Sequence, residues 1–298
     1  MEAKHSLEAF ENYIKENLRA STASVYVRDT GYCIRYMGEE KTYNATYQDI
    51  MDYVAHLRSK QNKVKVISRQ LASLKCFYSF LIEAGYRTAH PCKNLNLKDN
   101  KTETIQLQDL FKPEELERLL ERKERFTRLV TLKNKVMMSL LIYQALRNGE
   151  LAQIKMQDLD LEKGTIYVRS IAKSKARTLP LKSQQVMLFY KYIYEVRPKL
   201  LALSNKPSDH FIINLRGLPE TGLGVQNLVE SFQHYFPNRK LNSVTIRQSV
   251  IANLLKEGKD IRLVQEFAGH TSLTTTEKYR ENNLNELQNI IQKYHPLQ

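Results

Sequence analysis

The chain has 298 residues, of which 42% are hydrophobic, so it is long enough for two domains and too apolar to be disordered throughout. Its formal net charge of +14 predicts a polyanionic partner. Residues 1–100 carry 15 Lys and Arg against 11 Asp and Glu, and the remainder carries 31 against 21, so both parts are basic. A basic protein without such a partner is the alternative interpretation.

The cysteines and the hydropathy pattern argue against a secreted, membrane or metal-binding protein. The three cysteines, Cys33, Cys76 and Cys92, are odd in number and lack metal-ligand spacing, which is typical of reduced thiols in the cytoplasm. The first five residues contain no apolar signal region. The most apolar stretch, residues 136–146, is too short to cross a bilayer. We therefore expect a cytoplasmic protein without a metal.

Apolar side chains recur with the 3.6-residue helical period in residues 6–96. The first two expected helices begin at Ser6 and Ser21. The third runs through residues 50–57, and the fourth covers residues 66–84. Gly38 is expected to end the second helix. This pattern predicts an all-helical N-terminal domain over residues 1–97.

One face of the helix over residues 66–84, with the residues just before it, carries cations of a single sign. These cations are Lys63, Lys65, Arg69 and Lys75. A solvated surface is one interpretation, and contact with a phosphate backbone is the other. Phosphate contact is favoured because the charges of this stripe all have the same sign.

Residues 98–110 are polar and have no periodic apolar face, which predicts a linker between two domains. The second domain then covers residues 111–298 and begins with a helix at Pro113, since proline suits a first helical turn. Residues 164–181 form two β-rich runs around a polar tip and predict a hairpin. Helices are expected at 113–125, 132–146, 183–197 (ending before Pro198), 225–236, 243–257, 260–268, 273–281 and 283–294.

Four residues of the second domain, with a lysine of the hairpin tip, could cut a phosphodiester without a metal. Arg147 and Arg247 could bind phosphate oxygens through planar forks. Tyr279 could be the nucleophile, although a phenol with a pKa near 10 needs about 4 kcal/mol of help to ionise at pH 7. His270 is a further polar group, and Lys173 or Lys175 could protonate the leaving oxygen.

These residues and their spacing resemble the tyrosine recombinases of the phage integrase family, most of all the Xer-type enzymes. Residues 146–151, Leu-Arg-Asn-Gly-Glu-Leu, are similar to the segment of the first family arginine, with Glu150 as its acidic neighbour. Arg247 matches the second arginine. His270 matches the family histidine, and Tyr279 matches the nucleophile nine residues later. Residues 67–78 resemble the most recognisable helix of the family's SAM-like core-binding domain.

The chain departs from the family pattern at one position that bears on activity, and it offers two candidates for the catalytic lysine. Val244 stands three residues before Arg247, where the family usually has a histidine that serves as a base or hydrogen-bond donor. We therefore expect weakened or differently assisted chemistry. At the hairpin tip, Lys173 is favoured as the general acid, because Lys175 aligns better with a second, non-catalytic basic residue of the family.

The resemblance implies a mainly α, two-domain fold in which the N-terminal domain and an α+β catalytic domain grip opposite faces of double-stranded DNA. It also implies a 3′-phosphotyrosine intermediate and no cofactor. The expected assembly is a dimer on each site and a tetramer in the synapse, built from this chain or with a related recombinase. The helix over residues 283–294 is expected to link the protomers, and packing within its own chain is the alternative. A non-catalytic DNA-binding protein and an enzyme like a type IB topoisomerase are the alternatives. The target sequence, and a role in integration, excision, inversion or resolution, stay open.

Overall fold

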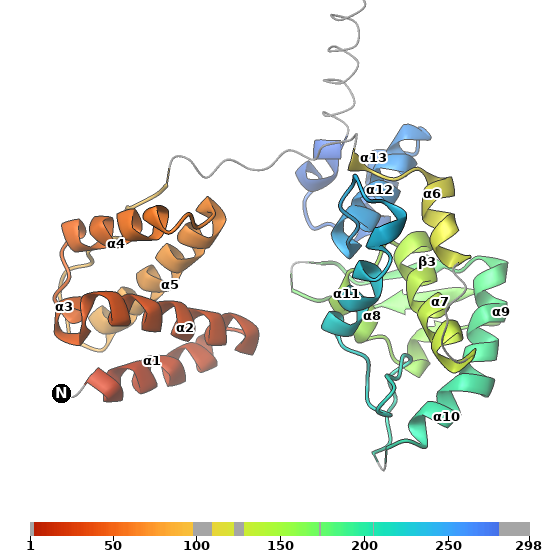
Figure 1. The fold of residues 1–298 in the computed structure, drawn as a ribbon, viewed down its shortest axis with the longest axis horizontal. Coiled ribbons are helices and arrows are strands. Elements are labelled where there is room, and N and C mark those ends of the chain that lie inside the picture. The colour runs from red at the N-terminus through yellow and green to blue at the C-terminus, as the bar shows by residue number, and fades with distance from the viewer. Residues whose placement is uncertain (1–2, 98–108, 122–127, 173, 205, 280–298) are drawn as a thin grey trace, which may run out of the picture. The chain divides into compact units, whose positions relative to one another are not determined.

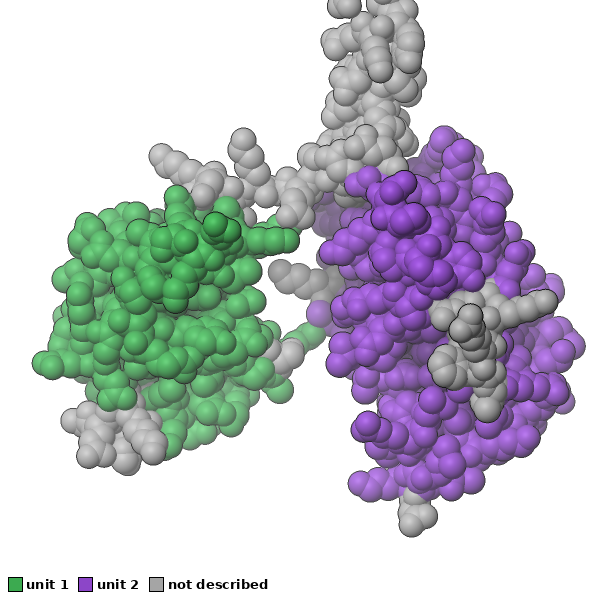
Figure 2. All heavy atoms as spheres, in the orientation of Figure 1, with its two compact units in different colours: residues 1–103 green, residues 104–298 purple. Residues whose placement is uncertain are grey.

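The computed structural model describes residues 3–97, 109–121, 128–172, 174–204 and 206–279. The chain divides into two compact units, residues 1–103 and 104–298, coloured separately in Figure 2. Most of the predicted linker, Lys173 and the predicted helix over residues 283–294 lie outside the described residues. In the part of the chain that is described, no helix is both long and apolar enough to cross a membrane.

The first unit is a bundle of helices, as the sequence pattern predicts (Figure 1). The helices are α1 (Ala3–Asn17), α2 (Ala20–Met37), α3 (Glu39–Tyr43), α4 (Tyr47–Ser59) and α5 (Val64–Glu83). Aromatic rings fill its core, with Phe10 of α1 set edge-to-face on Phe77 of α5 at 5.2 Å between ring centres. The buried Tyr78 hydroxyl donates a hydrogen bond of 2.9 Å to the Thr42 carbonyl, which ties α5 to α3.

The helix ends in this unit partly correct the prediction. Gly38 ends α2 as expected, with a φ of 83° that favours glycine. The helices expected to begin at Ser6 and Ser21 instead begin at Ala3 and Ala20, so neither serine is an N-cap. The short helix α3 was not expected.

The second unit combines helices with a small antiparallel sheet. Its strands are β1 (Leu159–Asp160), β2 (Thr165–Val168) and β3 (Arg177–Pro180), in the order β1-β2-β3. The predicted hairpin is β2 and β3, with Ile166 opposite Leu179, and both of these side chains are buried. Tyr167 and Thr178, which alternate with them, are exposed, so one face of the hairpin packs on the core. Strand β1 was not expected.

The helices of this unit are labelled in Figure 1. They are α6 (Pro113–Glu117), α7 (Arg128–Tyr143), α8 (Asn148–Ala152), α9 (Ser183–Lys191), α10 (Arg197–Leu201), α11 (Gly222–Glu230), α12 (Ser243–Lys256) and α13 (Ile261–Ala268). The expected helical stop before Pro198 is wrong. A π-helical turn over Tyr192–Val196 leads into α10, whose first turn contains Pro198, where the missing N–H is not needed. Residues 274–279 are also helical and carry Tyr279.

Candidate active site

Arg147 and Glu150 shape the beginning of α8. Arg147 is the N-cap residue, and its backbone N–H and its Nη1 each donate a hydrogen bond of 2.9 Å to the Glu150 carboxylate. The Glu150 side chain is only 1% exposed, whereas that of Arg147 is 42% exposed. The buried carboxylate therefore holds one side of the Arg147 guanidinium and leaves the rest accessible to an anion.

Arg177 is a buried cation of the site that sequence reasoning missed. From β3, its Nη1 and Nη2 each donate to Glu150 at 3.1 Å, and its Nε donates to the Phe267 carbonyl at 2.7 Å. It thereby connects the hairpin, the beginning of α8 and the end of α13. The available signal was an arginine at an inward-facing position of the predicted strand, two residues before the buried Leu179.

The Glu150 carboxylate is negatively charged at neutral pH. Burial by itself raises its pKa, but hydrogen bonds and charge from Arg177, with further contributions from Arg147, outweigh burial and bring the pKa down to about 2. A carboxyl group with so low a pKa is unsuited to proton transfer at neutral pH. Its geometry suits the support of Arg147 and of the turn that holds it.

Arg247 lies in the second turn of α12 and is almost fully buried. Its Nη1 donates to the Ala145 carbonyl and its Nη2 to the Ala268 carbonyl. Ala145 has a φ of 51°, in the left-handed region that alanine seldom adopts, and this turn precedes Arg147. Burial, and then the charge of Arg147, lower the pKa of Arg247 to about 10, so it stays cationic at neutral pH.

His270 follows a tight glycine turn at the end of α13. Gly269 caps the helix with a φ of 65°, and its carbonyl accepts the Lys175 backbone N–H at 3.0 Å. The buried His270 ring places Nδ1 2.9 Å from the Thr276 hydroxyl. Burial, followed by the charges of Arg247, Arg147 and Arg177, lowers the pKa of His270 to about 4, so the imidazole is neutral at pH 7.

Tyr279 is 6% exposed and packs in a small apolar cluster with Ile251, Ala252, Val264 and Ala268. Ile251 lies one helical turn after Arg247 on α12, so this packing places the ring beside the arginine's helix. Burial raises the pKa of the phenol, and the charges of Arg247 and Arg147 act against burial. Burial outweighs the two arginines, so the phenol is protonated at neutral pH.

The other predicted site residues are divided between the hairpin tip and the surface. Lys173 lies outside the described residues, and the Lys175 side chain is exposed. Val244 is 61% exposed and lies one turn before Arg247 on α12, at the end of the helix nearer its N-cap. A longer side chain at this position could extend from the helix without displacing core residues.

The predicted cationic face of the first unit is partly occupied by internal contacts. Arg69 donates through Nε and Nη2 to the buried Asp29 of α2, at 2.7 and 3.1 Å. Lys75 donates to Asn96 at 3.3 Å. Lys63 and Lys65 are exposed. Arg69 therefore fixes α5 against α2, which limits its freedom to follow a phosphate.

The described residues of the second unit form an anion site beside a phenol. Arg147, Arg177 and Arg247 surround a single buried carboxylate, and a neutral imidazole and Tyr279 lie near them. This surplus of guanidinium suits a bound phosphate whose negative charge grows during reaction. Over the residues described, no cluster of three or more His, Cys, Asp or Glu side chains could hold a metal ion.

Models of known protein families match both units of the chain. Residues 109–286 match the model of the phage integrase family, and residues 7–85 match the phage integrase N-terminal SAM-like domain. Tyrosine recombinase XerD of Oceanobacillus iheyensis is 31% identical over 98% of this chain and 99% of its own. Tyrosine recombinase XerC of the same strain is 28% identical over 97% and 95%.

Solved structures share the fold. The XerH site-specific recombinase bound to palindromic difH substrate has a TM-score of 0.68 at 18% identity, over 96% of this chain and 94% of that one. A lambda integrase dimer bound to a COC′ core site also has a TM-score of 0.68, at 15% identity, over 93% and 94%.

Proposed function

The chain belongs to the phage integrase family and is a tyrosine-type site-specific DNA recombinase, and we propose that Tyr279 is the nucleophile with which it cuts DNA. The observation that carries this assignment is the packing of the buried Tyr279 ring on Ile251 and Ala252 of α12, the helix that carries Arg247. A scissile phosphate held by Arg147 and Arg247 would lie next to the phenol.

In the proposed reaction Tyr279 Oη forms a bond to the scissile phosphorus and the bond from phosphorus to the 5′ oxygen breaks. Arg147 and Arg247 donate to the non-bridging oxygens, where negative charge accumulates in the transition state. The products are a 3′-phosphotyrosine and a 5′-hydroxyl. The 5′-hydroxyl of the partner strand later attacks the same phosphorus, so the bond energy is conserved without a cofactor.

Two proton transfers accompany cleavage. The leaving 5′ oxygen takes a proton from Lys173, by the family resemblance. His270 has two states, set by its hydrogen bond to Thr276. Cleavage uses the tautomer whose Nδ1–H donates to the threonine hydroxyl, because Nε2 is then free to accept the phenolic proton. Val244 cannot serve in either transfer, so the vacant position slows cleavage.

The proposed assembly is two protomers on one recombination site and four in a synapse of two sites. Support comes from the family and from the related lambda integrase, which was solved as a dimer on a core site. The apolar residues Leu284, Leu287, Ile290 and Ile291 would dock into a neighbouring protomer. Deleting residues 283–298 should abolish assembly of two or more protomers on DNA and spare the binding of one. Unchanged assembly would refute the docking proposal.

A nicked suicide duplex tests the assignment of Tyr279. The DNA that flanks the coding region is first sequenced to find inverted repeats, and duplexes containing those repeats are incubated with the protein and run on a denaturing gel. The wild type should give a covalent band that Tyr279→Phe abolishes and Tyr235→Phe, at an exposed tyrosine of the same unit, retains. Specific binding without a band would favour a non-catalytic DNA-binding protein. DNA relaxation without strand exchange would favour an activity like that of type IB topoisomerases.

A further inference from the structure

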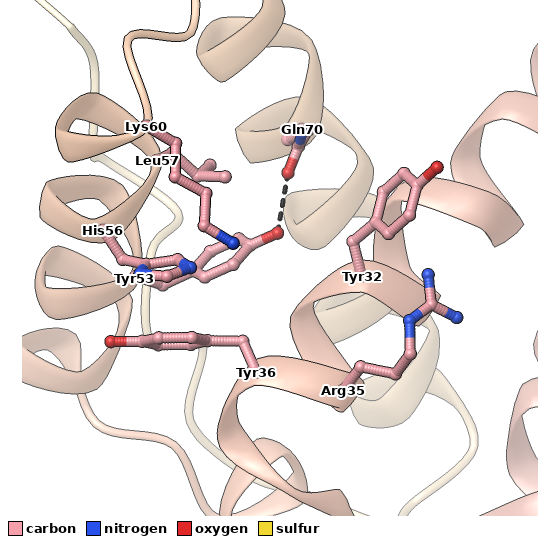
Figure 3. Close-up of a pocket in the computed structure, with 8 residues that line it drawn as sticks. All are labelled: Tyr32, Arg35, Tyr36, Tyr53, His56, Leu57, Lys60 and Gln70. Carbon is pink, nitrogen blue, oxygen red and sulfur yellow. Dashed lines mark hydrogen bonds between the residues drawn. The ribbon is translucent and has the colours of Figure 1, made fainter.

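The first unit contains a pocket that the proposed chemistry does not use. It has a volume of about 480 Å³, within the range of small-molecule sites, and opens between α2 and α4 (Figure 3). Helix α2 contributes Tyr32, Arg35 and Tyr36. Tyr53 and His56 of α4 and Lys60, which follows that helix, line the other side.

Two tyrosines of the pocket are supported on one side and remain accessible. The Tyr36 ring stacks on His56 with 4.2 Å between ring centres and 25° between planes. The Arg35 guanidinium lies over the Tyr32 ring, 4.7 Å from its centre. Tyr32 and Tyr36 are nevertheless 44% and 42% exposed. Aromatic rings held in place but still accessible are platforms on which a flat, unsaturated ring can stack.

The polar groups of the pocket select the charge of its ligand. Arg35 and Lys60 bring two positive charges, and none of the eight lining residues shown in Figure 3 is acidic. On the floor, the Tyr53 hydroxyl donates to Gln70 Oε1 at 2.6 Å, which presents polar atoms beneath the rings. The two positive charges would repel a cation. A purely apolar ligand would displace water from the polar atoms of Tyr53 and Gln70 without replacing its hydrogen bonds, which is unfavourable. The chemistry therefore fits a planar ring with polar edges that is attached to an anion.

We propose that this pocket binds one nucleotide of a DNA strand whose base has left the base stack. The base lies against Tyr32 and Tyr36, and its phosphate meets Arg35 and Lys60. The inference rests on the proposed function only in that DNA is the polymer the protein handles. The pocket belongs to the unit that does not contain Tyr279, so the two proposals fail separately.

The test compares two duplexes that differ at one position, a 2-aminopurine that is paired with thymine in one duplex and has no partner base in the other. The full-length protein should bind the duplex with the unpaired base about tenfold more tightly, the scale of one stacked base. Binding should lower the fluorescence of the unpaired 2-aminopurine, because its base then stacks on the tyrosine rings. Tyr32→Leu and Tyr36→Leu should each bring the ratio of the two dissociation constants close to one. Tyr36→Phe, which retains the ring, should preserve it.

The control variant is Tyr47→Leu, which changes a 56% exposed tyrosine of α4 outside the pocket and should leave the ratio unchanged. Thermal unfolding by circular dichroism verifies that every variant is folded. Tyr279→Phe should keep the preference for the unpaired base, even if another residue proves to be the nucleophile. Equal binding of both duplexes by the wild type, or a ratio that Tyr36→Leu does not lower, overturns the proposal. Micromolar displacement by free AMP, sensitive to Tyr36→Leu, would assign the pocket to a free nucleotide and also overturn it.

Discussion

Glu150 and Arg177 form a bidentate ion pair in the interior of the second unit, with both contacts at 3.1 Å and both side chains 3% exposed or less. The same carboxylate holds Arg147, and the same guanidinium holds the carbonyl of Phe267. The two residues thus couple the Arg147 turn to the turn that presents His270. Arg177 is a positioning residue, because its described hydrogen bonds go to protein groups on three separate segments.

Removing Arg177 should therefore destabilise the protein strongly. In Arg177→Met the Glu150 carboxylate stays buried and loses two of its hydrogen bonds to guanidinium groups, while that to Arg147 remains. We therefore expect a loss of about 3 kcal/mol in the free energy of unfolding. Urea titration followed by circular dichroism measures this loss. The control is Lys182→Met, which breaks an exposed pair with Glu117 at 3.4 Å and should cost less than about 1 kcal/mol. Equal losses in the two variants would contradict the role given to the buried pair.

Gly269 is required for two separable reasons, its backbone conformation and the close approach of Arg177. A Cβ at this position would lie 2.6 Å from Arg177 Nη1 and 3.0 Å from the Lys175 carbonyl. At Gly258, where φ is 78°, a Cβ would meet nothing within 4 Å. Gly258→Ala should thus cost about 1 kcal/mol for backbone strain alone. Gly269→Ala should cost at least about 1 kcal/mol more and slow covalent adduct formation, which the suicide duplex measures.

The sequence could predict which chemical groups gather in the second unit, because the reaction limits which residue types can serve. Arg147, Arg247, His270 and Tyr279 carry functional groups that few other residues replace, so their spacing is informative. Arg177 was missed because its partner is 27 residues away and no local pattern signals that pairing. Arg69 shows the reverse error. The sequence predicts a surface cation at this position, whereas the side chain pairs with the fully buried Asp29, 40 residues away.

The longer helices were predictable in approximate position because their apolar faces must pack, but the short helices, such as α3 and α8, and the helix ends were not. The helix over residues 66–84 is α5, Val64–Glu83. Pro198 misled the prediction because proline both stops helices and begins them, and the sequence alone does not distinguish these cases. The Thr46 capping box with Asp49, which begins α4, was readable from the Thr-x-x-Asp spacing and was overlooked.

Stability should fall as the pH drops below about 6.5, because two buried groups bind protons more weakly when folded than when unfolded. His270 has a folded pKa of about 4 against its ordinary 6.5, so its contribution is complete above pH 6.5 and lost towards pH 4. Glu150 has a folded pKa of about 2 against 4.5, so its contribution is lost between pH 4.5 and 2. Each contribution is on the order of 3 kcal/mol when complete.

Urea titrations at pH 7.5, 6.0 and 5.0 isolate the part due to His270. His270→Asn should flatten the dependence of the unfolding free energy on pH over this range. The matched control His234→Asn changes an exposed histidine and should retain the wild-type slope. An unchanged slope in His270→Asn would show that this imidazole is not the group responsible.

The two lysines of the hairpin tip should be distinguishable by the leaving group. Lys173→Ala should slow cleavage of an ordinary strand by roughly 10²-fold or more, the usual scale of general acid catalysis. A 5′-sulfur leaving group needs no proton, so it should restore the rate of Lys173→Ala. Lys175→Ala should show a smaller loss without rescue, because its backbone contact to Gly269 is independent of the side chain. Rescue of Lys175→Ala alone would reverse the assignment.

Val244→His tests whether the vacant position on α12 limits cleavage. Val244 is one turn before Arg247 and largely exposed, so the substitution should change the free energy of unfolding by no more than about 0.5 kcal/mol. An imidazole there can exchange protons or donate a hydrogen bond to the phosphate that Arg247 binds, and we expect cleavage of the suicide duplex to accelerate roughly tenfold or more. Val244→Leu matches the change in size without the ring nitrogens and should leave the rate unchanged. A Val244→His rate at or below the wild type would mean that the arginines, His270 and the lysine already supply what this position lacks.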